Sequence, residues 1–289
     1  MTGRKKTGRW LGFFVSIVLL LACALCVSGA WETGEVLYHQ DFSVISSASA
    51  AGVLYGGNTE GGEVAVRGDD LVIRGHDAFA VYALLPETEP YPDSYTVEFT
   101  FRFEPREEDV VSNRYISLLL SASPENLSGS VGVRIRANGR IELEDPRSHK
   151  SEFGVLSEEN KEKLLRAVQT GDSIHVSVPV EDNRMRSVRF TVDGESFSCH
   201  REEDFVLPQN GRIGFLVRNA YAAVEEVWVV AGVDYTEKTG TYAAESWRDD
   251  GKTGPEDPPY APPTGDAVPG YLLIIAAGLL IGFVIRKKR

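Results

Sequence analysis

The chain has 289 residues, a formal net charge of −12, 43% hydrophobic residues, 10% aromatic residues and three cysteines. The excess of acidic residues argues against a nucleic-acid-binding domain, and the apolar content argues against a disordered chain. Three cysteines are too few for a fold held together by disulfides. The length fits one large all-β domain or two smaller domains, and one core is the simpler interpretation.

The first 30 residues have the layout of a secretory signal peptide. Four basic residues precede position 10, an uncharged run extends from Trp10 to Val27, and small residues lead to Ala30. Because signal peptidase cuts after small residues at this offset, we expect cleavage after Ala30, which would leave Cys199 as the single cysteine. Two alternatives stay open. One is an uncleaved membrane anchor, since about 18 apolar residues can just span a bilayer; the other is lipidation of Cys23, which ends a lipobox-like run.

Residues 31–235 are expected to form an all-β, antiparallel sandwich. The stretch Tyr95–Glu104 alternates without a fault between apolar and polar residues, which is typical of a half-buried antiparallel strand. The pairs Asn138-Gly139 and Asp193-Gly194 supply the positive φ angles that two-residue hairpin turns need. Further short strands are expected at 64–66, 71–73, 79–82, 116–120, 131–136, 141–143, 174–180, 188–192, 213–217 and 224–230. Ten or more short strands with turns between them indicate a sandwich.

One segment of this region is expected to be helical instead. Ser157 can cap a short polar helix over residues 157–168. Leu164, Leu165 and Val168 would line one side of that helix.

The order of strands and turns resembles concanavalin A-like or laminin G-like jelly rolls. The resemblance rests on Asp41-Phe42-Ser43, on Leu84-Leu85-Pro86 before the strand at 95–98, on the hairpin at 192–195, and on Gly211–Phe215 before the last strand, and it spans residues 41–229. It implies an antiparallel jelly-roll sandwich. Members of that superfamily bind glycans, cleave them or only pack against neighbours, so the fold leaves the function open.

The sequence lacks the complete carboxylate motif of the related hydrolases. Members resembling the glycoside hydrolase 16 type carry an E-x-D-x-x-E strand whose alternating carboxylates act as nucleophile and acid. The nearest match begins at Glu142 and has Glu144 on the same face, but lacks the aspartate at the right offset and the final glutamate. We interpret Glu142 as a solvated charge on the outer face of its strand, opposite Ile141 and Leu143, and expect no enzyme activity.

No metal or cofactor site is expected. The five histidines are scattered singly, and Cys199-His200 has no further ligands at zinc-like spacing. Asp69-Asp70 follows Gly68 between two short apolar strands and is most simply a turn, although a structural calcium ion there stays an alternative.

Glycan binding is the best positive hypothesis for the body, within a generic adhesion or scaffold role. Sugars are held by an aromatic platform and hydrogen-bonding polar groups. The polar strand faces supply Arg102, Arg134, Glu142 and His175, with Trp228 as the stacking residue. Two alternatives come from other classes: a divergent glycoside hydrolase that uses Glu142 and Glu144, and a purely structural surface subunit.

Residues 236–263 are rich in proline, glycine, threonine and acidic residues. Such a segment cannot bury enough apolar surface to order itself, so we expect a semi-rigid stalk.

Residues 261–289 resemble the cell-wall sorting signal of Gram-positive surface proteins. The pentapeptide Ala261-Pro262-Pro263-Thr264-Gly265 keeps the proline, threonine and glycine of the LPxTG pattern and has alanine at its first position. An apolar helix at about 268–285 and four basic residues follow. The resemblance implies that a sortase attacks the Thr264 carbonyl and transfers the chain to a peptidoglycan amine. The alternative is a single-pass membrane protein, with its C-terminus in the cytoplasm.

The basic residues are concentrated at the two ends of the chain, so the part between them is more acidic than the overall net charge indicates. They hold eight of the 30 basic residues and one of the 42 acidic residues, which leaves 22 basic and 41 acidic residues, a net charge of −19, in residues 31–264. We therefore expect an acidic extracellular domain at the cell wall or membrane. Its net charge would repel nucleic acid and anionic polymers and favour neutral glycans, cations or basic partners.

Overall fold

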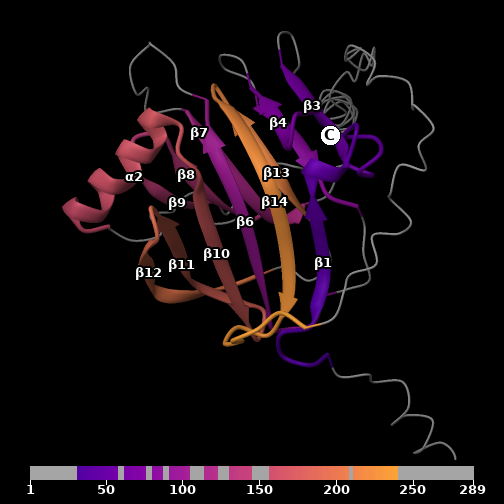
Figure 1. The fold of residues 1–289 in the computed structure, drawn as a ribbon. Coiled ribbons are helices and arrows are strands. Elements are labelled where there is room, and N and C mark those ends of the chain that lie inside the picture. The colour runs from indigo at the N-terminus through magenta and orange to yellow at the C-terminus, as the bar shows by residue number, and fades with distance from the viewer. Residues whose placement is uncertain are drawn as a thin grey trace, which may run out of the picture.

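The computed structural model describes residues 31–57, 62–75, 80–86, 91–104, 114–122, 130–144, 156–207 and 211–239. Fourteen strands within these ranges form two antiparallel sheets that pack face to face (Figure 1). The all-β sandwich predicted from the sequence is therefore confirmed. The signal peptide with Ala30 and Cys23, residues 240–263 of the stalk and the sorting signal lie outside the described residues.

The first sheet has eight strands, and seven of them follow the order β12-β11-β10-β6-β14-β4-β3. The long strand β14 pairs with β4 through its first residues and with β1 through its last ones, so β1 and β4 lie end to end along its side. The strands are β1 (Val36–Asp41), β3 (Glu63–Arg67), β4 (Asp70–Arg74), β6 (Tyr95–Phe103), β10 (Ile174–Glu181), β11 (Arg184–Val192), β12 (Glu195–Val206) and β14 (Tyr221–Ala231).

The second sheet has six strands in the order β2-β5-β13-β7-β8-β9. These are β2 (Leu54–Gly57), β5 (Ala80–Leu84), β7 (Tyr115–Ala122), β8 (Gly132–Arg136), β9 (Ile141–Glu144) and β13 (Arg212–Arg218). A short 3-10 helix, η1 (Phe42–Val44), follows β1. Strands β1 and β2 are the two elements of the sandwich that the sequence did not predict.

The core lies between the two sheets and is built by side chains that alternate along each strand. On β6, Phe99, Phe101 and Phe103 are fully buried and face the second sheet. The Phe99 ring lies 5.2 Å from the ring of Phe215 on β13, which joins the two layers. Because each buried phenylalanine contributes about 2–3 kcal/mol, this row is a main source of stability. Cys199 is also buried here, and burial raises the pKa of its thiol to about 11.

Helix α2 (Glu158–Thr170) confirms the predicted helix and extends it by two residues. The Ser157 side chain accepts a hydrogen bond from the Asn160 backbone N–H, and Gly171 ends the helix in a left-handed conformation. Of the residues expected to line one side of the helix, Leu164 and Val168 are buried in the main core, whereas the third buried residue is Ala167 rather than Leu165. The helix lies at one side of the sandwich (Figure 1).

The two predicted hairpin turns differ. Asp193 and Gly194 both have positive φ, and Val192 pairs with Glu195, so this is the expected two-residue turn. In the other turn, Gly139 has a φ of +78° and donates its backbone N–H to the Arg136 carbonyl. Asn138 does not have a positive φ there, because the loop is one residue longer and needs only one left-handed residue.

After β14 the chain turns back at Gly232 and packs against the sandwich as far as Thr239. The Thr239 N–H donates to the Gly34 carbonyl, and the Thr239 carbonyl accepts from the Val36 N–H, at 2.7 and 2.9 Å. Residues 236–239, assigned to the stalk from the sequence, thus contact the body. Among the described residues, none of the helices has the length and apolar character that a bilayer crossing requires.

Candidate functional site

The five predicted site residues lie on two opposite surfaces. Arg102, His175 and Trp228 face outward from the eight-stranded sheet, whereas Arg134 and Glu142 face outward from the six-stranded sheet. We call these surfaces the eight-strand face and the six-strand face. Since the whole core lies between them, one small ligand cannot contact all five residues.

On the eight-strand face, the π surface of Trp228 is used by the protein's own side chains. The His39 imidazole stacks on it with ring centroids 3.4 Å apart and an interplanar angle of 14°. The Lys238 ammonium lies 4.1 Å from the ring centroid, and the indole N–H donates to Glu226 at 2.9 Å. Burial lowers the pKa of His39, and the nearby charges of Glu226 and Asp41 offset this only in part.

The returning segment after β14 is fixed to the same face through Glu98. The Tyr235 hydroxyl donates to this carboxylate, and Lys238 Nζ lies 2.7 Å from its Oε2. Burial alone would raise the pKa of Glu98, but the hydrogen bonds from Lys238 and Tyr235 outweigh it, so the pKa is lowered. Burial and the bond to Glu98 raise the pKa of Tyr235.

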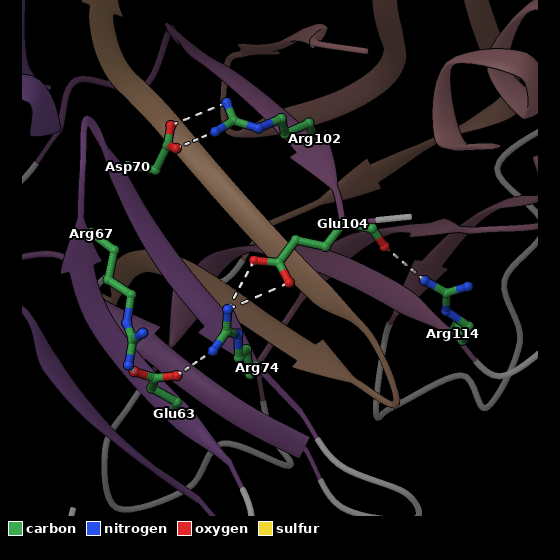
Figure 2. A network of polar contacts seen from close by, with 7 residues as sticks. All are labelled: Glu63, Arg67, Asp70, Arg74, Arg102, Glu104 and Arg114. Carbon is green, nitrogen blue, oxygen red and sulfur yellow. Dashed lines mark hydrogen bonds and ion pairs between the residues drawn. The ribbon is translucent and has the colours of Figure 1, made fainter. Parts of the chain in front are cut away.

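Elsewhere on this face, charged residues pair with one another. Arg102 contacts Asp70 and lies 3.0 Å from Glu225, which also accepts from the Ser173 hydroxyl. Burial raises the pKa of Asp70, and Arg102 offsets this only in part. Figure 2 shows this pair of Asp70 and Arg102 and, separately, a chain of contacts that runs from Arg67 through Glu63, Arg74 and Glu104 to Arg114.

The last predicted residue of this face is His175, which is half-buried. Its Nδ1 lies 3.2 Å from the Thr100 hydroxyl of the neighbouring strand. His175 therefore lies on the same face as Arg102, but the two side chains have different partners.

On the six-strand face, the interpretation of Glu142 as a solvated charge is wrong. Its side chain is only 11% exposed and forms ion pairs with Arg134 Nη1 at 3.3 Å, Arg136 Nη2 at 2.8 Å and Arg140 Nε at 3.2 Å. The β8–β9 hairpin causes this arrangement, because it places Arg134 directly opposite Glu142 and Arg140 in the connecting turn. Alternation predicted the correct face of the strand but not the local excess of guanidinium groups.

Tyr115 on β7 extends this charged cluster. The Arg134 guanidinium carbon lies 4.1 Å from the Tyr115 ring centroid, and that of Arg136 lies 5.6 Å away. Tyr115 is paired in register with Arg136 on one side and with Arg218 on the other. A guanidinium group over an aromatic ring is attracted to the π electrons of that ring, so Tyr115 helps to hold both arginine side chains in place.

The other half of the six-strand face is apolar and was missed from the sequence. Leu84, Leu119 and Ala122 are almost fully buried, with Tyr82 and Leu216 packed against them, in a cluster separate from the main core. The signal that could have revealed it is the sequence of β7, whose eight residues are all buried. An almost continuous apolar run is typical of a strand covered on both faces.

Glycines make this apolar half flat. A Cβ atom at Gly56 would lie 2.5 Å from the Tyr82 hydroxyl oxygen, and one at Gly214 would lie 2.7 Å from Leu84 Cδ2. Tyr82 and Leu84 therefore lie across the bare backbone of neighbouring strands instead of standing upright. The result is a shelf of side chains, formed by Tyr82, Leu84, Leu119, Ala122 and Leu216, beside the arginine cluster.

The described residues contain no group of three or more His, Cys, Asp or Glu side chains arranged to hold a metal ion. Asp69 lies with Gly68 in the turn between Arg67 and Asp70, as predicted. Asp70 itself begins β4 and contacts Arg102.

No protein-family model and no curated protein match the chain. Solved structures similar to it include arcelin-5, a lectin-like defense protein from Phaseolus vulgaris (11% identity, TM-score 0.46, 68% of this chain and 99% of that one). Another is the Lotus tetragonolobus seed lectin (12% identity, TM-score 0.48, 68% of this chain and 100% of that one). A third is the Emp46p carbohydrate recognition domain (13% identity, TM-score 0.47, 71% of this chain and 100% of that one). Similarity at this level says nothing about which ligand the present chain binds.

Proposed function

We propose that the chain is a non-catalytic carbohydrate-binding module on a concanavalin A-like jelly roll, and that it binds through the six-strand face. One observation carries the proposal. Strand pairing places Tyr82, Leu216, Ser117, Arg134 and Glu142 next to one another in a single row across five strands.

The row offers the two kinds of contact that sugars need. Sugar rings present apolar C–H surfaces, which pack on aromatic and aliphatic side chains, and hydroxyl groups, which bind charged and polar side chains. Tyr82 and Leu216 supply the first kind at one end, and Arg134 and Glu142 supply the second at the other. With neighbouring strands about 4.8 Å apart, the row is roughly 19 Å long, and Ser117 at its middle is buried between the partly exposed Leu216 and Arg134.

The fixed position of Glu142 favours binding over catalysis. Three arginines surround its carboxylate, so the two oxygens are held as hydrogen-bond acceptors in one orientation. Such a group can orient a sugar hydroxyl by accepting its hydrogen bond. On the opposite face, the ring of Trp228 is covered by His39 and Lys238, and Glu98 is bound by Lys238 and Tyr235.

Matched tyrosine substitutions on the two faces test the site. On a glycan array and by titration calorimetry, we expect Tyr82→Ala to weaken binding at least about 10-fold, equivalent to 1.4 kcal/mol, because the shelf loses its aromatic member. Tyr221→Ala is the control, since Tyr221 lies on the eight-strand face beneath Arg74 and its loss should leave affinity unchanged. The reverse result would move the site to the other face. Digestion of the bound glycan would show that the module is an enzyme.

We also propose that the module acts outside the cell, exported by residues 1–30 and attached through Thr264 by a sortase. The support is the signal-peptide layout and the Pro262-Pro263-Thr264-Gly265 sequence before an apolar run and a basic tail. Cell fractionation of Thr264→Ala tests it. The wild-type chain should leave with digested cell wall and the variant should stay with the membrane, and identical fractionation would contradict sorting.

A further inference from the structure

We infer that the returning segment, residues 232–239, is a latch that is closed near neutral pH and opens in acid. The closed form is the one described above, in which Lys238 lies over Trp228 and beside Glu98. Opening would separate the segment from the eight-strand face and leave the sandwich itself folded. Neither carbohydrate binding nor attachment to a cell wall is needed for this behaviour.

The returning segment buries little of itself. At its far end the two hydrogen bonds between Thr239 and residues 34–36, of 2.7 and 2.9 Å, join it to the body. At its start Gly232 has a φ of +82° and donates its N–H to the Ser94 carbonyl at 3.0 Å. Five of its eight residues are exposed to solvent, namely Asp234, Thr236, Glu237, Lys238 and Thr239. Segments with so little buried surface open locally while the rest of a protein stays folded.

Lys238 lies between two groups that can take up a proton. Trp228 pairs in register with His39 on one side and with Glu98 on the other, so these three residues form one row across β1, β14 and β6. The His39 imidazole stacks on the indole, and the Lys238 ammonium lies 4.1 Å from the centroid of the same ring. The ammonium also lies 2.7 Å from the Glu98 carboxylate. Protonation at either end of the row therefore acts on the same lysine.

Glu98 attracts Lys238 only while it is ionised. Burial alone would raise the pKa of Glu98, but the hydrogen bonds from Lys238 and Tyr235 lower it below its ordinary value. Both donors belong to the returning segment, so the open form lacks these bonds and its Glu98 would have a higher pKa than the closed form. Protons thus bind more tightly to the open form, and acid favours it.

His39 acts in the same direction. Burial lowers its pKa, Glu226 and Asp41 offset this in part, and the positive charge of Lys238 lowers it further. Opening would remove the charge of Lys238 and expose the imidazole, so the pKa of His39 would rise. The closed form is therefore fully stable above the ordinary His39 pKa of 6.5 and weakens as the pH falls towards the lowered value. It weakens again below 4.5, as the pH falls through the lowered pKa of Glu98.

The other groups near the row alter this balance little or oppose it. Arg189 lies 4.0 Å from Asp234, but both side chains are more than half exposed, so this pair contributes little. A positive charge on His175 would favour the Glu98 carboxylate and oppose opening. Tyr235 stays protonated in acid, because burial and its bond to Glu98 raise its pKa. The two groups whose protonation opens the latch are thus His39 and Glu98.

Hydrogen exchange of the purified full-length chain, followed by mass spectrometry, tests the latch. The reporters are the backbone N–H groups of Val36 and Thr239, which lose their hydrogen bonds on opening. Between about pH 7.5 and about pH 4, we expect their protection factors to fall at least about 10-fold, while those of β6 change less than about 3-fold.

Two lysine substitutions assign the fall to Lys238. Lys238→Met removes the ammonium and keeps a flexible apolar side chain, so the protection of Val36 and Thr239 should already be low at about pH 7.5 and change less than about 3-fold in acid. Lys163→Met is the matched control and should show the wild-type fall, because Lys163 pairs with Glu159 and Glu195 instead.

Three results would overturn the proposal. One is a wild-type protection of Val36 and Thr239 that does not change with pH. Another is an equal fall in Lys238→Met, which would show that the lysine does not hold the segment. The third is a joint loss of protection in the segment and in β6, because the sandwich would then unfold as a whole.

Discussion

The two outer faces of this sandwich share one core but organise their side chains in opposite ways. On the eight-strand face, acidic and basic residues of neighbouring strands pair with each other (Figure 2). The returning segment adds Tyr235 and Lys238 to that face. On the six-strand face, three arginines gather around the Glu142 carboxylate, beside a shelf flattened by glycines. The contrast teaches that outward-facing positions in one fold can be organised either as dispersed ion pairs or as one charged cluster beside an apolar one.

The largest effect is expected where the shelf is most closely packed. A Cβ at Gly214 would lie 2.5 Å from the Ala83 carbonyl oxygen and 2.8 Å from Leu84 Cα, so the backbone itself must move. Gly214→Val should lower the free energy of unfolding by about 3 kcal/mol in urea denaturation. Ala65→Val is the control, since Ala65 is half-exposed on the outer side of edge strand β3 and should change stability by no more than about 0.5 kcal/mol. Equal effects would mean that the shelf is not closely packed.

The next effect concerns the carboxylate of the six-strand face. Glu142→Gln removes the negative charge from the two largely buried residues Arg134 and Arg136 and from the half-exposed Arg140, and should cost about 2–4 kcal/mol in the same assay. A cost near zero would show that the arginine cluster does not depend on Glu142.

The corresponding change on the eight-strand face should be smaller. Glu98→Gln weakens the bonds from Lys238 and Tyr235 and should cost about 1–2 kcal/mol near pH 7. Because the folded-state pKa of Glu98 is lowered, its contribution is present above its ordinary pKa of about 4.5 and is lost as the pH falls through the folded value. The difference between wild type and Glu98→Gln should therefore shrink in acid. A difference that is constant down to pH 3 would contradict the lowered pKa.

The smallest effect is expected at His39. Burial lowers its folded-state pKa below the ordinary value of 6.5, so protonation favours the unfolded chain. The stability that neutral His39 provides is present above about pH 6.5 and falls as the pH drops towards the folded value. Urea denaturation at pH 7.5 and 5.5 should show a larger loss for wild type than for His39→Gln, and parallel losses would argue against this role.

Local patterns in the sequence predicted most of the fold. The alternation in Tyr95–Glu104, the Asp193-Gly194 turn and the Ser157 cap each depend on neighbouring residues, and the structure shows all three. Strands β1 and β2 were missed because each is defined by a distant partner, β14 and β5, rather than by its own pattern.

The candidate site was much harder to predict. Alternation gives the face of a strand to which a side chain belongs, but not which of the two sheets contains the strand. Trp228 and Arg134 were for that reason grouped on one surface, although they lie on opposite sides of the core. The shelf depends on Tyr82 lying over Gly56 and Leu84 over Gly214, and these neighbours become apparent only when the strand order is known.

The contact between Thr239 and the Gly34–Val36 segment has a practical consequence. The backbone enters and leaves the sandwich at the same place, joined by hydrogen bonds of 2.7 and 2.9 Å. A domain whose ends lie this close together can be inserted into a surface loop of a host protein without stretching either chain. The same proximity permits a circular permutant, with a short linker joining the two ends and new termini opened at the Asp193-Gly194 turn. Both outer faces of the sandwich would remain accessible in such a chimera.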